Sequence, residues 1–241
     1  MKKRKRSSTS RRTLMKWGLC GLGVVALTTV PGRLIAQTPS GSKTLTFKAD
    51  DVGISNFALL LEELEAAFYA AVVQSGKITN SQERDYIKAL AAHEAEHVAF
   101  LRRTLGKNVT FQTDDLSFNQ RGLAALLKDR KTILETAVAL EDAGVHAYNG
   151  AGPSIKNPAL LLAAGSIVSV EARHAAGVRA LLMRPVTEPD SDRAVKDPDL
   201  VAKLNPFKGR AYDELYTPKQ IVAIVSSLNV INNPITGALV A

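Results

Sequence analysis

A cluster of histidine and glutamate lies in the stretch Ala92 to Phe100, which reads AHEAEHVAF. His93 to His97 fit the pattern H-E-x-x-H, in which two histidines bind zinc and the glutamate acts as general base in peptide hydrolysis. The same stretch contains a plain Glu-x-x-His, Glu94 to His97, which is half of a carboxylate-bridged site for two metal ions. The two interpretations imply different chemistry, so the rest of the chain must decide between them.

A second Glu-x-x-His lies further along the chain, in the stretch VEARHAAGVRALL that contains Glu171 and His174. The offset between the two copies is 77 residues. Two further stretches also resemble each other, LEELEAAFYAA from Leu61 and LEDAGVHAYNGA from Leu140. We infer from these similarities that a helical hairpin has been duplicated.

The second pair of similar stretches aligns two glutamates and two tyrosines. Glu62 matches Glu141 and Tyr69 matches Tyr148, each at an offset of 79 residues, and both Glu-to-Tyr gaps are seven. The chain therefore offers one glutamate from each of two segments and a Glu-x-x-His from each of two others.

Four long helices are predicted from apolar periodicity and from end signals. Asn80, with Glu83 three residues later, forms a capping box at the start of the second helix, and Asn157 followed by Pro158 opens the fourth. Gly76 and Gly106 end the first two helices, and Gly150, Gly152 and Pro153 end the third. The predicted helices cover residues 54–75, 80–105, 128–149 and 157–183.

The lengths of the connections predict the topology. The first and second helices are separated by about five residues and the third and fourth by about seven, which indicates two antiparallel pairs. About twenty residues, 106–127, join the pairs and include a short helix at 121–127. Residues 43–48 and 109–111 are at most short extended pieces, and a last helix is expected at 217–228. The predicted class is all-α, a four-helix bundle of two antiparallel hairpins joined by one long crossover.

The glutamates and histidines lie on the apolar faces of these helices. Ile167, Val170, Val178 and Leu181 surround the pair Glu171 and His174, and the other three helices show similar stripes. A buried carboxylate without a partner costs several kcal/mol or takes up a proton. Two divalent cations would nearly neutralise four carboxylates and give each metal one histidine.

This ligand set resembles that of the ferritin-like di-iron and di-manganese carboxylate proteins. More narrowly, FALLLEELEAAFY, EHVAFLRRTLG, LEDAGVHAY and VEARHAAGVRALL resemble exported ferritin-like proteins, some of them described as desiccation-related. The resemblance covers roughly residues 50–183 and implies two iron or manganese ions, with Glu94 and Glu171 as bridging candidates. The ligands it implies are Glu62, Glu94, His97, Glu141, Glu171 and His174.

The resemblance leaves some neighbouring residues to be assigned. Tyr69 and Tyr148 are expected to hydrogen-bond ligand carboxylates or to act as one-electron donors. Glu65 lies one turn from Glu62 and is a second candidate ligand on the first helix. The remaining candidates are not expected to be ligands. His93 is expected at the surface or beside the ligands, Glu63 and Glu96 are expected to be solvated surface residues, and His146 is expected to point away from the site.

The zinc-protease interpretation of HEAEH remains as an alternative. It needs His93 and His97 on one zinc ion with Glu94 as base and a distant glutamate as third ligand. No G-x-x-H follows His97, and the counterpart of His93 in the repeat is Val170. It also leaves the other buried glutamates without a role, so we favour the two-metal site.

The net charge of +8 belongs to the N-terminus. Residues 1–36 contain nine of the 31 Lys and Arg and no acid, so the rest of the chain holds 22 basic and 23 acidic residues, and we do not expect a nucleic-acid partner. The stretch SRRTLMK, Ser10 to Lys16, resembles a twin-arginine signal, and a short apolar stretch follows it. The only cysteine, Cys20, lies inside this segment, so metal sites must use histidine and carboxylate.

The sequence thus predicts an export signal at 1–36, a linker at 37–52, a ferritin-like bundle at 53–184 and a C-terminal extension at 185–241 that packs on the bundle. The twin-arginine translocase would deliver the protein to the periplasm or the outside, or the N-terminus would stay as a membrane anchor. The expected function is metal binding with reaction of O2 or H2O2 in oxidative or desiccation stress. A non-catalytic metal-binding or structural stress protein is the alternative, and a homo-oligomer is compatible with either.

Overall fold

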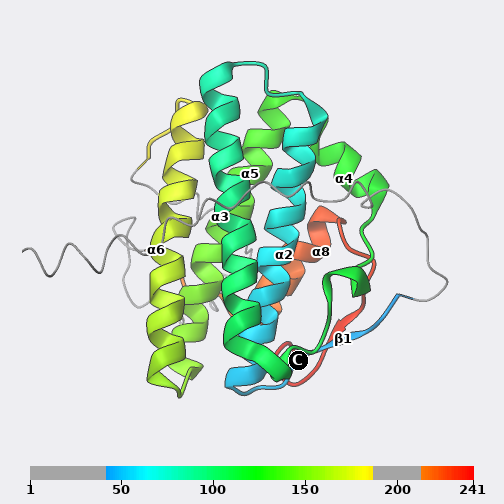
Figure 1. Ribbon diagram of the computed structural model, residues 1–241, viewed down its shortest axis with the longest axis vertical. Helices are drawn as coiled ribbons and strands as arrows, with labels where there is room; N and C mark the ends of the chain where they lie inside the picture. The colour runs from blue at the N-terminus through cyan, green and yellow to red at the C-terminus, as the bar shows by residue number, and fades with distance from the viewer. Residues whose placement is uncertain (1–41, 187–212) are drawn as a thin grey trace, which may run out of the picture. The chain divides into compact units, whose positions relative to one another are not determined.

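The computed structural model describes residues 42–186 and 213–241, and the predicted export signal lies outside these residues. Four long helices run alongside one another as a bundle (Figure 1). Consecutive helices within each hairpin, α2 with α3 and α5 with α6, pack closely along their lengths. Their bounds are α2 Asp51–Ser75, α3 Ser81–Leu105, α5 Arg130–Ala151 and α6 Pro158–Leu181.

Side-chain caps define the starts of these helices. The Asp50 carboxylate accepts a hydrogen bond from Gly53 N, so α2 begins three residues before the predicted position. Asn80 caps α3 as predicted, by accepting from the backbone N–H groups of Gln82 and Glu83. The second half of the predicted capping box is absent, because the Glu83 side chain pairs with Arg130 at 2.6 and 2.7 Å.

Gly150 has a different role from the one expected of it. It lies inside α5, which continues to Ala151 and then tightens into the 3-10 turn η3, Gly152–Ser154. A Cβ atom at Gly150 would lie 1.9 Å from the carbonyl oxygen of Tyr216. The glycine therefore allows the C-terminal segment to approach the α5 backbone closely, and it does not end the helix.

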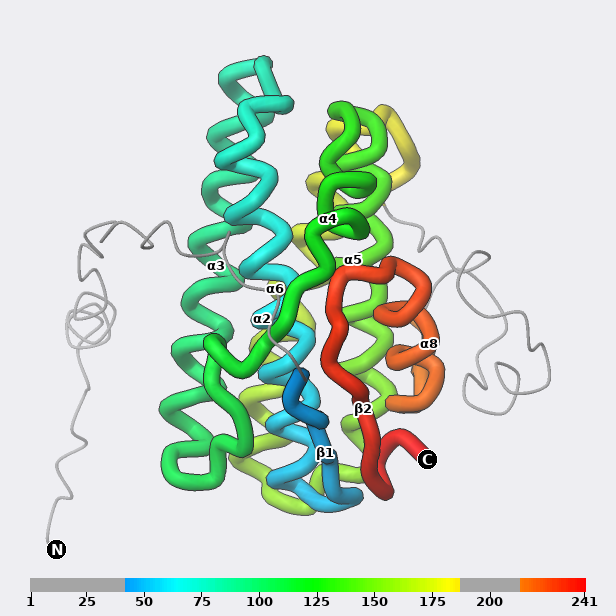
Figure 2. Tube along the Cα trace, turned by 90° about the vertical axis from the view of Figure 1, so that its right-hand side faces the viewer, coloured from blue at the N-terminus to red at the C-terminus, as the bar shows by residue number. Residues whose placement is uncertain are grey.

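The crossover between the hairpins includes the turns η1 (Gly106–Asn108) and η2 (Thr113–Asp115) and the short helix α4 (Gln120–Leu126). Figure 2 shows it rising along one face of the bundle from the end of α3 to the start of α5. Residues 109–111 form no strand, and of residues 43–48 only β1, Leu45–Thr46, does. Helix α5 follows the crossover and runs antiparallel to α6, as the predicted topology requires.

The C-terminal residues pack against the face that carries the crossover. Helix α8, Pro218–Leu228, contacts α5, and strand β2, Ile235–Thr236, pairs in parallel with β1 (Figure 2). An antiparallel bridge joins Phe118 of the crossover to Ile231. The pairing of β1 with β2 joins segments that lie 190 residues apart in the sequence.

The core consists of two apolar clusters separated along the helix axes. One includes Leu61 and Leu64 of α2, and the other starts at Phe68 on the same helix. On α5 the division falls between Leu140 and Ala143. On α3 and α6 the predicted Glu-x-x-His pairs lie in the corresponding gaps. The predicted ligands thus form a polar layer between two apolar ones.

Helix α6 is the one helix within residues 42–186 and 213–241 that is long and apolar enough to span a membrane by length and composition. In the bundle it turns Glu171 and His174 inward, where both are buried. Its buried face therefore combines this polar pair with apolar residues such as Ile167 and Val178.

Asn233 ties the C-terminal segment to two other segments. It is buried, donates to the carbonyl oxygens of Lys43 and Asp115 at 2.8 and 2.9 Å, and accepts from Ser117 N at 2.6 Å. We predict that Asn233→Ala lowers the free energy of unfolding by about 2–4 kcal/mol, because buried backbone groups lose their partners. Urea unfolding measures this loss, and the exposed neighbour Asn232→Ala should cost less than about 1 kcal/mol. Equal losses in the two variants would contradict the assignment.

Candidate metal centre

The polar layer is supplied by all four long helices. Glu62 comes from α2, Glu94 and His97 from α3, Glu141 from α5, and Glu171 and His174 from α6. The four glutamates are at most 1% exposed. A helical i,i+3 spacing places each Glu-x-x-His pair on one face, and the bundle turns those faces toward each other. The structure therefore brings together the six residues that the sequence singled out.

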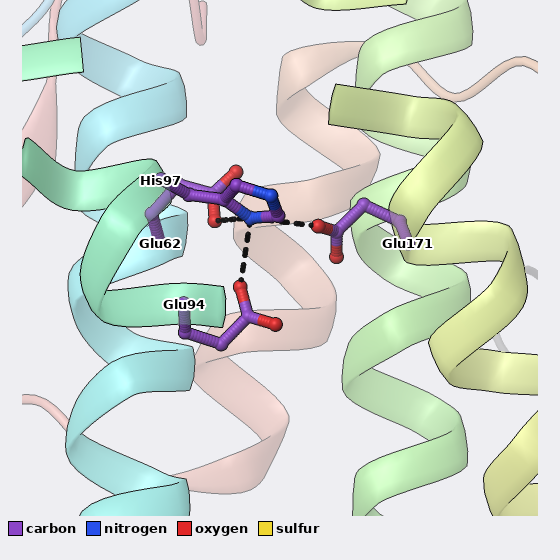
Figure 3. Close-up of side chains that lie close together, drawn as sticks. All are labelled: Glu62, Glu94, His97 and Glu171. Carbon is purple, nitrogen blue, oxygen red and sulfur yellow. Dashed lines mark hydrogen bonds and ion pairs between the residues drawn. The ribbon is translucent and has the colours of Figure 1, made fainter. Parts of the chain in front are cut away.

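Three carboxylates surround His97. Its Nδ1 atom lies 3.1 Å from Glu62 Oε2, 3.1 Å from Glu94 Oε2 and 3.0 Å from Glu171 Oε1 (Figure 3). These four residues form one group whose ligand atoms all lie within 4.8 Å of one another. One ion at the centre of this group would meet three oxygens and one imidazole nitrogen.

A second group forms around His174. Its Nδ1 atom lies 2.9 Å from Glu94 Oε1 and 3.2 Å from Glu141 Oε2. With Glu171, these residues also place ligand atoms within 4.8 Å of one another. Glu94 and Glu171 belong to both groups, and Glu94 turns Oε1 toward His174 and Oε2 toward His97.

The two tyrosines pair with the glutamates of the opposite hairpin. The Tyr69 hydroxyl on α2 donates to Glu141 Oε1 on α5, and the Tyr148 hydroxyl on α5 donates to Glu62 Oε1 on α2. Each of these glutamates thus gives one oxygen to a tyrosine and turns the other toward a histidine. The Glu and Tyr that are seven residues apart in the sequence therefore do not pair with each other. Each tyrosine pairs with the glutamate of the other hairpin.

The protons of this layer are held unusually tightly. Burial raises the pKa of Glu62 to about 8 and raises the pKa of Glu65 and Glu141 well above the ordinary value. Burial lowers the pKa of His97, but the contacts with Glu171, Glu62 and Glu94 outweigh it and raise the pKa to about 12. The same opposition raises the pKa of His174 to about 10. In the metal-free protein, bound protons on glutamate and histidine therefore offset the negative charge of the layer, as cations would.

Glu94 behaves in the opposite way. Burial raises its pKa, but the contacts from His174 and His97 are stronger together and lower the pKa to about 2. Glu94 is therefore the carboxylate that remains ionised between the two histidines. A negative charge at this position, shared by both groups, favours the binding of cations on either side of it.

Three buried oxygens in the layer form no well-directed hydrogen bond among the described residues, although two of them lie within 3.0 Å of a histidine Nδ1 atom. They are Glu94 Oε1 and both oxygens of Glu171. Buried polar atoms are nearly always satisfied in folded proteins, so such a group calls for an ion or water. The donor set of carboxylate oxygen and imidazole nitrogen fits divalent iron, manganese or zinc.

His93 lies outside both ligand groups. Its Nδ1 atom is 2.8 Å from Nε2 of His174, and the two rings stack with centroids 5.1 Å apart. The zinc-protease interpretation needs His93 and His97 on one ion, whereas their nearest partners here differ. His93 instead contacts the outer nitrogen of His174, which fixes the orientation of that ring.

Glu65 lies beside the groups but belongs to neither of them. A Cβ atom at Gly144 would lie 3.2 Å from Glu171 Oε2 and 3.5 Å from Glu65 Oε1. The absence of a side chain at Gly144 therefore makes room for both carboxylates. Sequence reasoning missed Gly144, although a glycine within the helix and one turn after Glu141 was a signal for it.

Glu63 is not a solvated surface residue, and that expectation was wrong. Its side chain is buried and accepts from Arg102 Nε at 3.1 Å and from Thr113 Oγ1 at 2.9 Å. The crossover that carries Thr113 covers this face of α2, and a single helix pattern does not predict such cover. Glu96 is exposed, as expected.

His146 is buried against Tyr216, with ring centroids 4.5 Å apart, and is outside the two groups. Burial lowers its pKa to about 4. It is therefore neutral at ordinary pH and packs the C-terminal segment onto α5.

The raised pKa values predict how stability depends on pH in chelator-treated protein. The pKa values of Glu62 (about 8) and His174 (about 10) lie above their ordinary values of 4.5 and 6.5. The folded state therefore binds these protons more tightly, and their stabilisation is lost as pH rises through the folded values. We expect the melting temperature to fall between pH 6 and pH 9, measured by circular dichroism, and to fall less steeply in Glu62→Gln. A melting temperature that rises over this range would contradict the assignment.

Comparison with known proteins agrees with the geometry. The family model of the ferritin-like domain matches residues 50–184. None of the curated proteins compared matches the chain. The predicted all-α, ferritin-like class is confirmed by this match and by the helical bundle. Since the match covers more than half of the sequence, the chain belongs to the ferritin-like family.

Proposed function

We propose that the protein holds two divalent metal ions, iron or manganese, bridged by Glu94 and Glu171. Glu62 and His97 would complete one site, and Glu141 and His174 the other. The observation that carries this proposal is the position of Glu94, whose two oxygens face two different histidines from within two overlapping ligand groups. A single zinc ion would use only one of the two ligand groups.

Charge balance supports two ions. Four carboxylates carry four negative charges when ionised, and two divalent cations supply four positive ones. In the metal-free layer, protons on glutamate and histidine perform this neutralisation. Metal binding would release those protons, which links metal affinity to pH.

The tyrosines would determine how Glu62 and Glu141, the two glutamates that do not bridge the metals, bind them. Tyr148 takes Glu62 Oε1 and Tyr69 takes Glu141 Oε1, so each glutamate has one oxygen left for a metal. One-oxygen binding at both ends would keep coordination positions available for a small molecule. His93, through its contact with His174, would hold one imidazole ligand in place.

The activity that we propose is the reaction of O2 or H2O2 at this centre. An iron or manganese pair, when bound, supplies reversible one-electron steps that no side chain here provides alone. The buried, water-poor surroundings of the four glutamates suit such chemistry because they limit the escape of reactive products. A role in oxidative or desiccation stress would follow from the removal of these oxidants.

We also propose that the protein acts outside the cytoplasm, in the periplasm or beyond. The support is the sequence SRRTLMK at Ser10 to Lys16, which resembles a twin-arginine signal. That route exports folded proteins, so the metal centre would be loaded before translocation. Retention by an uncleaved N-terminal anchor is the alternative outcome, and the N-terminal sequence of the exported protein distinguishes the two.

Metal content and turnover test the central proposal. We expect about two iron or manganese ions per chain in protein from its natural host, with consumption of O2 or H2O2. His174→Ala should remove at least one ion because it takes a ligand, whereas His93→Ala should retain both. Elemental analysis and oxygen-electrode assays measure these results.

Two other outcomes would change the assignment. One zinc ion per chain that is lost in His93→Ala and kept in His174→Ala would overturn the two-metal site in favour of the hydrolytic one. Two ions without consumption of either oxidant would contradict the catalytic role and leave metal binding or structural support as the function.

Glu62 and Glu65 give a matched test of ligand assignment on α2. Both are buried glutamates one turn apart, but only Glu62 belongs to a ligand group. We predict that Glu62→Gln lowers metal occupancy by about one ion, because an amide is a weak ligand. Glu65→Gln should keep two ions, because Glu65 belongs to neither ligand group and burial already disfavours the charged form of its carboxyl. Elemental analysis of both variants decides, and the reverse result would make Glu65 the ligand.

A further inference from the structure

An apolar cavity of about 270 Å³ lies at one end of the bundle, near the start of α2 and the end of α3. All four long helices and the C-terminal segment contribute to its wall. Representative lining residues are Leu61, Leu101, Tyr148, Ile167, Ile221 and Leu239. We call this space the apolar cavity.

The apolar cavity adjoins the candidate metal centre through one side chain. Tyr148 lines the cavity, and its hydroxyl donates to Glu62, which belongs to the ligand group around His97. Leu61 and Ile167, which also line it, lie one residue and one turn from Glu62 and Glu171 on their helices. A molecule inside would therefore lie against the tyrosine that orients a ligand.

The lining restricts the chemistry of the occupant. Within the part of the chain that the structure describes, no charged side chain contributes to the wall. Its side-chain polar groups are hydroxyls, from Ser55, Thr104, Tyr148, Ser154 and Tyr216. A charged ligand would lose its hydration without compensation here, whereas a hydrocarbon gains by leaving water.

The volume sets the scale of the occupant. A cavity of about 150 Å³ lined by aliphatic and aromatic side chains binds benzene. The apolar cavity is nearly twice as large and close to the lower limit of about 300 Å³ for ligand pockets. It suits an uncharged molecule larger than benzene, such as a medium-length alkyl chain with one hydroxyl group.

The C-terminal segment builds part of this wall from outside the matched domain. Tyr216, Pro218, Ile221, Ala238 and Leu239 line the cavity, whereas the family match ends at residue 184. Protein interiors are normally packed without voids of this size. An added segment that lines a partly open apolar cavity, and does not fill it, points to a binding site.

We propose that the apolar cavity binds an uncharged, mainly hydrocarbon small molecule and holds it against Tyr148. The binding site is inferred from the cavity alone. Its use as a substrate or effector site beside the metals rests on the proposed function. Any polar end of the ligand would meet a hydroxyl group of the wall, and its apolar part would contact the aliphatic lining.

The test uses the full chain and 1-octanol as the probe. Isothermal titration calorimetry should detect saturable binding of about one octanol per chain. Ala164→Leu places a larger side chain at a buried position of the wall, and Ala147→Leu places one at a half-buried position of the wall on α5. We expect both variants to weaken octanol binding by about tenfold or more.

Ala180→Leu is the matched control. It makes the same change on the same helix as Ala164→Leu, at an exposed position outside the cavity. Octanol should bind to it as to the unaltered protein, and melting curves show whether each variant is folded. No saturable binding to the unaltered protein, or equal binding to folded Ala164→Leu, Ala147→Leu and Ala180→Leu, would overturn the proposal.

A second measurement separates this inference from the proposed function. Saturating octanol should change the visible absorption of cobalt(II)-loaded protein, because it presses on the tyrosine that orients Glu62. An unchanged spectrum with octanol bound would overturn the placement against Tyr148. Protein that loads metal but does not bind octanol would contradict the cavity site alone, whereas octanol binding without any metal loading would contradict the proposed function alone.

Discussion

Four buried carboxylates in one cross-section of a helical bundle are the constraint on which the rest of this structure depends. Their mutual repulsion and lost hydration would unfold the layer if all four were ionised and alone. The chain meets this cost with two histidines whose protons are held tightly, with two tyrosine hydroxyls, and with the raised pKa values of Glu62 and Glu141. Divalent cations would meet it more fully, because they would also satisfy the oxygens of Glu94 and Glu171 that form no well-directed hydrogen bond.

The apolar clusters on either side stabilise this polar layer and hold its side chains in defined positions. They anchor each of the long helices at both ends of the layer, so the ligand side chains have little freedom to separate. The crossed tyrosine pairs add a connection between the hairpins at the same level. A site whose ligands come from rigid helices is better defined than one on loops.

The crossover and the C-terminal segment shape the surroundings of the site. The crossover covers Glu63 and Arg102, and the C-terminal segment approaches α5 so closely that Gly150 has no room for a side chain. The same segment lines the apolar cavity next to Tyr148. These additions give one end of a simple bundle a partly open apolar cavity beside the candidate metal centre.

The sequence by itself determined the four long helices, their pairing and the polar residues on their inner faces. Helical periodicity, caps such as Asn80 and Asn157, and the duplicated Glu-x-x-His carry this information locally, because each depends on residues within a few turns. Only the tertiary structure decided which atoms meet: Tyr69 with Glu141, Tyr148 with Glu62, His93 with His174, and Glu62 within a ligand group that leaves Glu65 outside. It also decided that Glu63 is buried and that Gly150 admits a neighbouring backbone. The physical reason is that a helix pattern fixes the direction of a side chain around its own axis, whereas the partner, the cover and the cavity depend on segments distant in the sequence.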